Sequence, residues 1–584
     1  MQIYPIDQLL IQEGFAAIPP LRALNPNKDN YSALLFQPQA DIEADTSGVR
    51  HADATLAAKQ FTSFLEMAIT DQADLAITPE YSMPWESLET AILNGTVPAS
   101  GSLWVLGCES TTLDKLAAFK DRVKGVATVI YEPLTPQPNR FLNPVAYVFM
   151  ATTAGTFATD RIVIVVQFKM SPMGDKEDYE KNHLQTGTRL YRFGSPPTQL
   201  GLATLICSDA FAITDNHALE LYHRTLLIHI QLNKSPRQAQ YRQYRDRFFQ
   251  YRSGETEILC LNWAKGVRIL CDGHNVPWTD MSGSAWYLCP DEFDNEDSTI
   301  KQNHEHGLYY TWLQDLRCHA LFFAYSPAVY SVTASKVAYH GVIASQARRR
   351  GPILTSVTVW DSSTSQWMAF GPVDDGFSAI VGTCGSATKD ITALALLNPL
   401  YAERSLALCA GAIPTNDWYT AKKLDSCSID KSEIIRRLTA CQDLHPDAQQ
   451  FRTLRLRTVL RIVKALGRPL PAALADLSAG YKFDWSPQFP HANIVSTNPS
   501  GNNRRATVIY LNDQHTEESA KDIAAKAADH IGQWAKDNDQ MVEGKQRIGV
   551  WFRDDHGEDV LLPNPFVDYD QPHTESPFDI GRGS

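Results

Sequence analysis

The sequence lacks the paired cysteine motifs of disulfide-stabilised and zinc-binding domains. Its ten cysteines are scattered over 584 residues, and none forms a Cys-X-X-Cys pair. In a chain of this length, such a distribution is typical of free thiols in a reducing compartment rather than of a disulfide framework or a zinc ribbon. We therefore expect a cytoplasmic protein.

Long apolar runs and an excess of positive charge are absent as well. No stretch of about 18 uncharged apolar residues occurs, so no membrane-spanning helix is expected. The first residues include Asp7 and Glu13 without a basic region, and they do not resemble a signal peptide. The formal net charge is −13, which gives no global indication of nucleic-acid binding.

The order of apolar runs predicts an α/β fold for the N-terminal part of the chain. A strand-like run at 31–37, an amphipathic helical pattern at 54–70 and a buried run at 73–78 together form a predicted βαβ unit. Further buried runs follow at intervals up to residue 313, and the pattern changes beyond about residue 340. Because the chain is too long for one hydrophobic core, we expect several domains.

The C-terminal part is predicted to mix strands and helices. A β-like run (353–360) precedes a helical stretch (428–477) that includes a helix at 448–466, and Ser432 is a plausible cap. Residues 487–503 are rich in Pro, Asn and Ser and are interpreted as a linker or a long loop. The expected organisation is a lead-in (1–30), an α/β domain (31–340), a mixed β and helical region (341–500), a β-α-β unit (501–565) and a loose tail (566–584).

Three of the buried runs lead into a residue that can take part in chemistry. The run at 73–78 is followed by Glu80, and two later runs end directly before Lys169 and Cys207. Strand ends in one α/β sheet converge at one edge, so we expect a carboxylate, a cation and a thiol to meet there. Each has an ordinary alternative: a helix-start carboxylate, a solvated strand end and a buried structural cysteine, respectively.

Cys207 lies where a buried run gives way to the polar pair Ser208-Asp209, with a helical pattern following at 215–221. At such a junction the sulfur can be exposed at the end of the sheet, and unpaired helical N–H groups favour the thiolate. The coincidence with the other two residues favours a catalytic role over a structural one.

Three segments resemble the motifs of the nitrilase, or carbon–nitrogen hydrolase, superfamily, and they occur in that family's order. They are ITPEYS (77–82), FKM (168–170) and LICSD (205–209). The interval of eleven residues from Lys169 to Glu180 resembles the N-carbamoyl amine amidohydrolase branch. The resemblance covers residues 30–340, and the remainder of the chain resembles no family.

The resemblance implies a four-layer αββα sandwich, followed here by a mixed α+β C-terminal region. It implies that Cys207 is the nucleophile, Glu80 the general base and Lys169 a group that stabilises the oxyanion and the thiolate. Glu180 would hold Lys169 or the substrate, with Glu177 the less favoured candidate. The implied substrate is a linear amide or an N-carbamoyl compound rather than a nitrile, no metal or organic cofactor is required, and a homo-oligomer is expected.

Two positions depart from the family's pattern or bear on the substrate. Ser208 follows the nucleophile where the family often has an aromatic residue, which leaves more room or polarity beside the sulfur. Asn233 lies where the family often places substrate-contacting residues, although a turn or capping role is the alternative. Both are candidate substrate-binding residues.

Other signals in the sequence are weaker. The His304-Glu305-His306 triplet lacks a third metal-binding partner. Four basic residues of the 448–468 segment share a helical stripe; this is interpreted as a solvated face, with docking of a protein or nucleic acid as the alternative. The stripe consists of Arg457, Arg461, Lys464 and Arg468.

Neither a Walker-type loop nor a Ser-Gly-Gly pyrophosphatase motif is present, which argues against an ammonia-consuming synthetase.

A second hypothesis for function belongs to a different class. The hydrolase-like domain would then be a sensor or assembly module that serves the C-terminal region within a larger regulatory or defence complex. The reactivity of Cys207 distinguishes the two hypotheses, because a catalytic thiol reacts faster with an electrophile than the remaining cysteines do.

Overall fold

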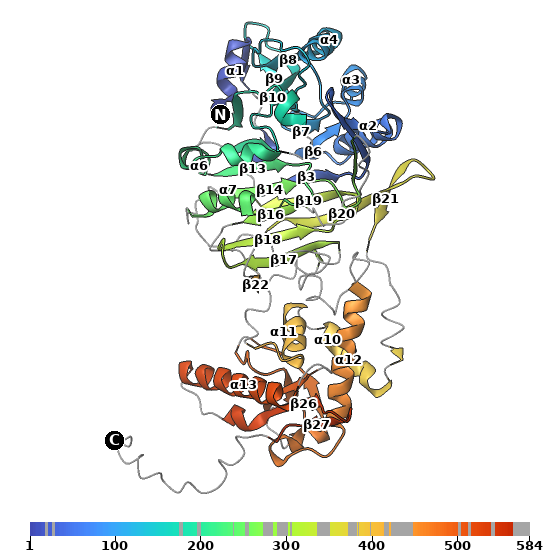
Figure 1. Ribbon diagram of the computed structural model, residues 1–584, viewed down its shortest axis with the longest axis vertical. Coiled ribbons are helices and arrows are strands. Elements are labelled where there is room, and N and C mark those ends of the chain that lie inside the picture. The colour runs from blue at the N-terminus through green and yellow to red at the C-terminus, as the bar shows by residue number, and fades with distance from the viewer. Residues whose placement is uncertain are drawn as a thin grey trace, which may run out of the picture. The chain divides into compact units, whose positions relative to one another are not determined.

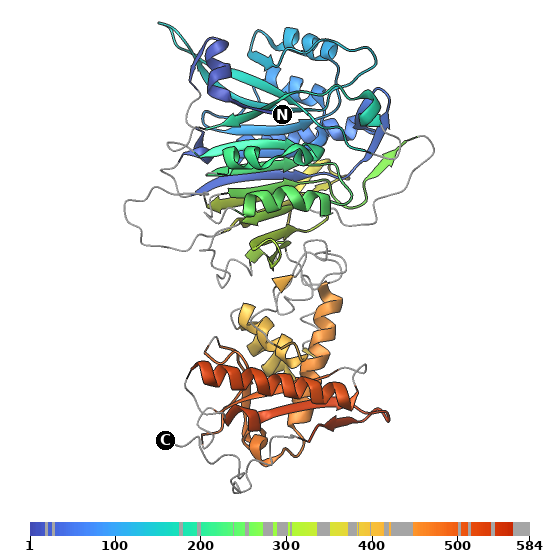
Figure 2. The same cartoon turned by 60° about the vertical axis from the view of Figure 1, so that its left-hand side comes forward.

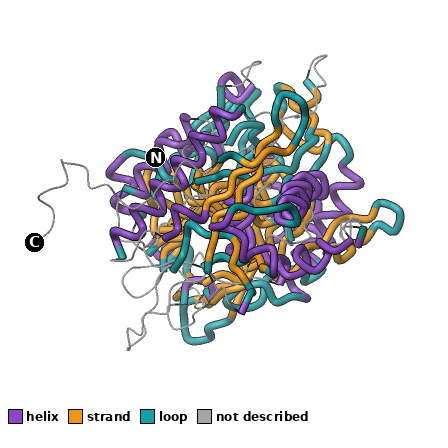
Figure 3. Tube along the Cα trace, turned by 90° about the horizontal axis from the view of Figure 1, so that it is seen from below, coloured by secondary structure: helices purple, strands orange, loops and turns teal. Residues whose placement is uncertain are grey.

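The computed structural model divides into two compact units. The first comprises Met1–Pro372 and Ala421–Glu433, and the second comprises Val373–Thr420 and Ile434–Ser584. The residues that the structure describes are drawn in colour in Figure 3 and are 1–17, 21–25, 30–174, 179–194, 200–222, 224–236, 239–250, 256–271, 284–288, 302–303, 306–335, 351–371, 382–383, 385–396, 399–413, 420–421, 448–486, 488–499, 504–511, 516–538 and 543–563.

The first unit contains two large mixed sheets (Figure 1). The first sheet has the strand order β1 (Gln2–Pro5), β11 (Arg189–Phe193), β12 (Gly201–Ile206), β13 (Thr225–Ile230), β14 (Thr256–Leu261), β16 (Ala285–Leu288), β18 (Cys318–Phe323), β17 (Leu308–Leu313) and β22 (Thr420–Ala421). The second has the order β21 (Gln366–Phe370), β20 (Ile353–Asp361), β19 (Ala328–Ser335), β3 (Asn30–Gln37), β6 (Leu75–Met83), β7 (Leu103–Cys108), β9 (Pro144–Thr153), β10 (Asp160–Phe168) and β8 (Ala127–Tyr131), and β2 (Phe15–Ala17) also pairs with β9. A small third sheet is formed by β15 (Arg268–Leu270), β4 (Asp41–Asp45) and β5 (Gly48–His51).

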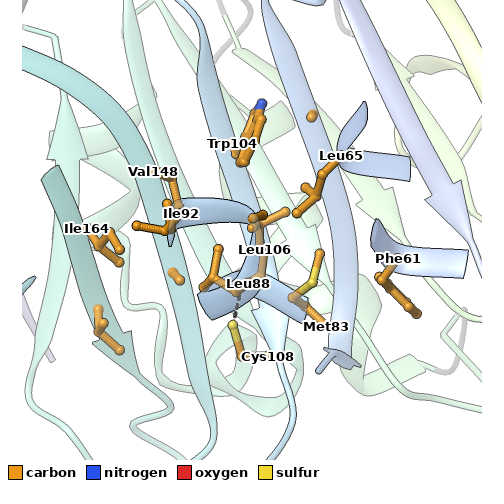
Figure 4. Close-up of a cluster of buried hydrophobic side chains, with 14 of the residues drawn as sticks. Phe61, Leu65, Met83, Leu88, Ile92, Trp104, Leu106, Cys108, Val148 and Ile164 are labelled. Atoms are coloured by element: carbon orange, nitrogen blue, oxygen red, sulfur yellow. Dashed lines mark hydrogen bonds between the residues drawn. The ribbon is translucent and has the colours of Figure 1, made fainter. Parts of the chain in front are cut away.

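Helices cover the outer faces of the two large sheets, so the first unit has the predicted αββα layers. On the second sheet, side chains of the covering helices join those of β6, β7, β9 and β10 in one apolar cluster (Figure 4). On the first sheet, α6 and α7 lie over the strands (Figure 2). The helices of this unit are α1 (Ile6–Gln12), α2 (Ala54–Thr70), α3 (Trp85–Leu93), α4 (Leu113–Val123), α5 (Tyr179–His183), α6 (Asp215–Leu221) and α7 (Ala239–Phe249), with 3₁₀ turns η1 (Arg22–Leu24) and η2 (Cys207–Ala212).

The inner faces of the two large sheets contact each other directly. Gln167 Nε2, near the end of β10, donates at 2.9 Å to the carbonyl of Thr204 in β12. The rings of Tyr147 in β9 and Phe193 in β11 lie 4.9 Å apart. These contacts bring the ends of β10 and β12 together, and with them the residues that follow these strands.

Local sequence signals explain several of these elements. The predicted helix at 54–70 is confirmed as α2, and the side chain of Asp53 caps it by accepting from the N–H of Leu56. Its apolar stripe, which includes Phe61 and Leu65, is fully buried. The lead-in at 1–30 contributes β1, whose parallel pairing with β11 extends the first sheet.

In the second unit one sheet lies between helices. Its strand order is β23 (Tyr481–Phe483), β24 (Ile494–Ser496), β25 (Arg505–Tyr510), β26 (Ile548–Arg553) and β27 (Asp559–Leu561). Val508 and Tyr510 pack with α12, whereas Ile509 packs with α13, as the alternation of a strand requires. The other elements are α10 (Thr388–Leu396), α11 (Pro399–Cys409), α12 (Ala448–Leu466), α13 (Glu517–Asp537), η3 (Gly385–Ala387), η4 (Ala472–Ala479) and η6 (Glu543–Arg547).

Two boundaries differ from those expected from the sequence. The first unit extends beyond residue 340 because β20 and β21 continue the second sheet next to β19. The stretch at 487–503, expected to be a linker or a long loop, contains β24, which pairs with both β23 and β25. The proposed cap Ser432 and the tail at 566–584 lie outside the described residues.

Candidate active site

Glu80 lies within β6 rather than after its end. The strand continues to Met83, and its pairing with β7 shifts register between Thr78 and Met83. Tyr81, at this irregularity, has a φ of 58°, which is a left-handed conformation that costs energy for a residue with a side chain. The predicted strand end was therefore wrong, because a local interruption within one longer strand produces the same sequence pattern.

Gly107 on β7 provides the space that this irregularity needs. A Cβ atom at position 107 would lie 2.0 Å from the carbonyl oxygen of Pro79 and 2.9 Å from the Cα of Glu80. Both are backbone atoms, so neither can move away without displacing β6. The backbone that carries Glu80 thus depends on a glycine in the neighbouring strand.

We expect Gly107→Ala to lower the free energy of unfolding by about 1–3 kcal/mol, the usual cost of overpacking, and to reduce activity by displacing Glu80. Urea denaturation measures the first effect. Gly125→Ala is the matched control, because a Cβ at Gly125 meets no atom within 4 Å. Equal stability of the two variants would show that the close approach of β6 and β7 imposes no constraint.

Lys169 follows β10 and contacts two buried carboxylates. Its Nζ donates at 2.9 Å to Glu80 Oε1 and at 2.7 Å to each carboxylate oxygen of Glu180. Glu180 lies in α5 and is 5 % exposed, and the other two side chains are each 1 % exposed. Since each of these charges is costly to bury alone, the three groups are stable only as a unit.

Four further donors complete the hydrogen bonding of the two carboxylates. Asn143 Nδ2 and the backbone N–H of Leu232 each donate at 2.7 Å to the first of them, Glu80. The hydroxyl of Tyr81 and the backbone N–H of Met173 donate at 2.5 and 2.6 Å to the second. Both carboxylates are therefore held by several segments that are far apart in sequence.

Cys207 begins η2 directly after β12. Its φ is 44°, so the nucleophile candidate occupies a strained turn between a strand and a helical segment. The side chain is 1 % exposed, and Sγ lies 3.3 Å from the hydroxyl oxygen of Tyr241 on α7. His229 in β13 contacts the Cys207 carbonyl oxygen through Nε2 at 2.9 Å, which fixes the backbone of the turn.

The three main candidates come from two sheets rather than from one. Glu80 and Lys169 belong to the second sheet, whereas Cys207 belongs to the first. The expectation of a single sheet edge was wrong, because the layered arrangement brings strand ends of facing sheets together. The carboxylate of Asp209 reinforces this junction by accepting, at 2.8 Å each, the backbone N–H groups of the two residues that follow Lys169.

The electrostatics of the site favour the protonated thiol over the thiolate. Burial raises the pKa of Cys207 well above its usual value, Glu80 raises it further, and Lys169 lowers it only in part. Lys169 thus favours the thiolate, as expected, but it does not prevail over the other two effects. Burial also raises the pKa of Glu80, although Lys169 opposes the shift, so this carboxylate is a stronger base than a solvated one.

The two candidate substrate-binding residues both have structural contacts. The Ser208 hydroxyl donates at 2.5 Å to the carbonyl of Ser171, which links η2 to the segment after Lys169. Asn233 Oδ1 accepts from the N–H of Ser235 at 2.8 Å, as a turn residue does. Asn233 Nδ2 is buried and has no hydrogen-bond partner within the described ranges.

Sequence reasoning missed His229 and Tyr241. A histidine inside the otherwise apolar run of β13 is a detectable signal, because buried polar groups need partners. Tyr241, Tyr244, Arg245 and Phe248 recur at helical spacing on α7 and are buried. The periodicity of this helix therefore marks its inner face, even though its composition is rich in arginine and glutamine.

The histidine-rich triplet and the basic stripe noted in the sequence are not part of the candidate active site. His304 and Glu305 are outside the described residues. In the second unit, Arg461 donates at 2.7 Å to the hydroxyl of Tyr510, and Arg468 donates at 3.2 Å to the carbonyl of Asp559. Two members of the basic stripe are thus used within their own unit.

No group of three or more His, Cys, Asp or Glu side chains among the described residues is arranged to hold a metal ion. Of the helices in the described ranges, none combines the length and the apolarity that a membrane crossing requires.

Comparison with known proteins gives similarity to solved structures alone. No family model matches the chain, and no curated protein matches it. An amidase from Nesterenkonia sp. is 13 % identical, with a TM-score of 0.27, and the match covers 44 % of this chain and 82 % of that one. A variant of the Nesterenkonia AN1 amidase, described as belonging to the nitrilase superfamily, is also 13 % identical, with a TM-score of 0.27 and coverage of 45 % and 84 %.

A glutamine-dependent NAD⁺ synthetase from Acinetobacter baumannii, solved with ADP, is 12 % identical. Its TM-score is 0.31, and the match covers 77 % of this chain and 70 % of that one. At these identities and TM-scores the similarities establish neither a family nor an activity for this chain.

Proposed function

We propose that the first unit is a thiol amidohydrolase that cleaves a non-peptide C–N bond, with a linear amide or an N-carbamoyl compound rather than a nitrile as the substrate. The observation that carries the proposal is the buried Lys169 cation between Glu80 and Glu180, within electrostatic reach of the strained Cys207. A protein gains no stability from burying two carboxylates and one cation beside a thiol. The arrangement therefore supports a catalytic role for these residues rather than a structural one.

In the proposed first step, the carboxylate of Glu80 accepts the thiol proton and Cys207 Sγ attacks the substrate carbonyl carbon. The carbonyl oxygen gains the negative charge and is stabilised by the positive field of Lys169 and by the backbone N–H of Ser208. The C–N bond then breaks, Glu80 returns the proton to the departing nitrogen, and ammonia or an amine leaves. A thioester on Cys207 remains.

In the second step, Glu80 accepts a proton from water, and the resulting hydroxide attacks the thioester carbon. The C–S bond breaks, the sulfur recovers a proton from Glu80, and the acid is released. Glu180 keeps Lys169 in position throughout. Asn233 Nδ2 is the proposed substrate-binding donor, and Ser208 shapes the same side of the sulfur through its link to Ser171.

The proposal is tested by incubating the protein with a panel of primary amides and N-carbamoyl amines and measuring ammonia release. Glu80→Gln is expected to slow both formation and hydrolysis of the thioester by about 10²–10⁴-fold. Prolonged incubation therefore lets the acyl group accumulate on the peptide containing Cys207, where mass spectrometry detects it. The mass of the adduct then identifies the acyl part of the substrate.

The control combines Glu80→Gln with Cys207→Ala, which removes the attachment point and should carry no adduct. If the folded wild-type protein releases no ammonia and the Glu80→Gln variant gains no mass from any compound of the panel or from a cell extract, the amidohydrolase proposal fails. A sensor or assembly module would then be the better interpretation.

A further inference from the structure

The hydroxyl group of Tyr241 lies between two sulfur atoms. Its oxygen is 3.3 Å from Cys207 Sγ and 3.7 Å from Met173 Sδ. The side chain is buried, and its ring packs against Phe211 and His229, with centroid distances of 4.7 and 5.8 Å. These contacts fix the ring, so that the hydroxyl stays beside the nucleophile.

A tyrosine hydroxyl has one proton and can donate it to one acceptor at a time. While Cys207 carries its own proton, the thiol can donate to the Tyr241 oxygen and the hydroxyl can donate to Met173 Sδ. Once the thiol proton has left, Sγ is only an acceptor. A rotation about the C–O bond then turns the hydroxyl proton toward Sγ without any movement of the ring.

The lysine of the site has no hydrogen bond left for the sulfur. An ammonium group has three protons, and Lys169 Nζ contacts three carboxylate oxygens, one of Glu80 and two of Glu180. Lys169 therefore acts on Cys207 through its field and not through a direct donor. The thiolate needs a donor from another element, and α7 carries one at hydrogen-bond distance.

We propose that Tyr241 is a catalytic residue that donates a hydrogen bond to the Cys207 thiolate, both when the thiol is deprotonated for attack and when the thiolate leaves the acyl-enzyme. This role rests on the proposed amidohydrolase function and adds a fifth catalytic residue to Glu80, Lys169, Glu180 and Cys207. Burial raises the pKa of the Tyr241 hydroxyl, so it remains a protonated donor throughout the working pH range.

The ionisable groups around Cys207 come from every neighbouring element. His229 is neutral, because burial and the positive charge of Arg245 lower its pKa to about 3. Among the others, Tyr241 is the group whose polar atom lies at hydrogen-bond distance from Sγ. The groups are Glu80 and Tyr81 on β6, Lys169 after β10, Glu180 on α5, Asp209 on η2, His229 on β13 and Tyr241 on α7.

Alkylation of Cys207 by iodoacetamide, followed by peptide mapping, tests the proposal without a known substrate. Loss of a charge-assisted hydrogen bond in Tyr241→Phe raises the thiol pKa, and the higher nucleophilicity of the more basic thiolate offsets part of the effect. The alkylation rate at neutral pH is therefore expected to fall by about 3- to 20-fold. A fluorinated tyrosine at position 241 has a more acidic hydroxyl and should raise the rate.

Met173→Leu is the matched control, because it removes the competing acceptor and retains the donor. Its alkylation rate should equal or exceed that of the wild-type protein. If Tyr241→Phe melts at the wild-type temperature and its Cys207 reacts as fast as or faster than in the wild type, the proposal is overturned. The same holds if the fluorinated residue slows the reaction.

The two proposals can fail separately. A wild-type protein that hydrolyses no amide refutes the amidohydrolase function, whereas the alkylation rates still decide whether Tyr241 donates to the sulfur. A wild-type protein that hydrolyses amides, together with a Tyr241→Phe variant of unchanged alkylation and turnover rates, refutes only the role of Tyr241.

Discussion

Replacing Cys207 by alanine is expected to lower the hydrolysis of amide substrates by about 10⁴-fold or more, the scale on which removal of a catalytic nucleophile acts. The methyl group has no electron pair with which to attack a carbonyl carbon, and the neighbouring Tyr241 hydroxyl is held protonated by burial, which raises its pKa. The free energy of unfolding should change by no more than about 1 kcal/mol, because one sulfur atom is removed and the contacts of the surrounding side chains remain.

Cys108→Ala provides the matched control. Cys108 is also fully buried, but it belongs to the apolar cluster between the second sheet and its helices (Figure 4). This variant removes an equally buried sulfur atom, so it should lose a similar amount of stability, and it should retain the wild-type turnover. Undiminished hydrolysis by Cys207→Ala, measured as ammonia released from a substrate of the wild-type protein, would contradict the assignment of the nucleophile.

The framework of the site could be predicted because its elements have strong local patterns. The apolar runs that became β10, β12 and β13 are buried along their whole length, and α2 shows a regular apolar stripe. The polar residues at the ends of such runs are conspicuous for the same reason. Lys169 and Cys207 could thus be selected from the sequence, since a polar residue directly after a buried strand stands at the edge of a sheet.

The partners of these residues could not be predicted, because they depend on contacts between distant segments. Glu80 is 63 residues from Asn143 and 152 residues from Leu232, and both donate to its carboxylate. No local pattern encodes such pairs. The layering of two sheets, which brings Cys207 to the carboxylates, is likewise a property of tertiary packing rather than of any one segment.

The short strand β24 was hidden by its surroundings. Its three residues, Ile494–Ser496, are buried and pair on both sides, yet they lie in a stretch dominated by Pro, Asn and Ser. Composition over a window of seventeen residues outweighs a run of three, so the sequence predicts a linker or a long loop there. Strands of this length are recognised only when a neighbouring strand is already in place.

The cation at the centre of the site explains how two buried carboxylates can coexist. Lys169 directs its three donors to Glu80 and Glu180, which leaves a net charge of −1 distributed over several hydrogen bonds. Burial alone would lower the pKa of Lys169, but the two carboxylates raise it well above its usual value, so the side chain stays charged. The site therefore depends on this cation for its stability as well as for its field.

Lys169→Met is consequently expected to destabilise the fold by about 3–5 kcal/mol at neutral pH, because it leaves two uncompensated carboxylates in the interior. Urea denaturation measures this change, and turnover should fall with it. Lys124→Met is the control, since the side chain of Lys124 is 76 % exposed and its removal should change stability by less than about 1 kcal/mol. Equal stability of the two variants would mean that Lys169 does not compensate the carboxylates.

The pH dependence of the same variant separates charge from packing. Burial already raises the pKa of Glu80, and loss of Lys169 removes the charge that lowers it. A carboxyl group whose pKa is raised in the folded state binds its proton more tightly there than in the unfolded chain. Its destabilising effect is therefore fully present at pH values above the folded-state pKa and disappears at pH values below the unfolded-state pKa. The stability deficit of Lys169→Met should therefore shrink as the pH falls from 7 toward about 4, near the unfolded pKa of a glutamate. A stability deficit that stays constant over this range would mean that the loss comes from the packing of the lysine stem. In that case the double variant Lys169→Met/Glu180→Gln, which has one buried charge fewer, should be no more stable than Lys169→Met.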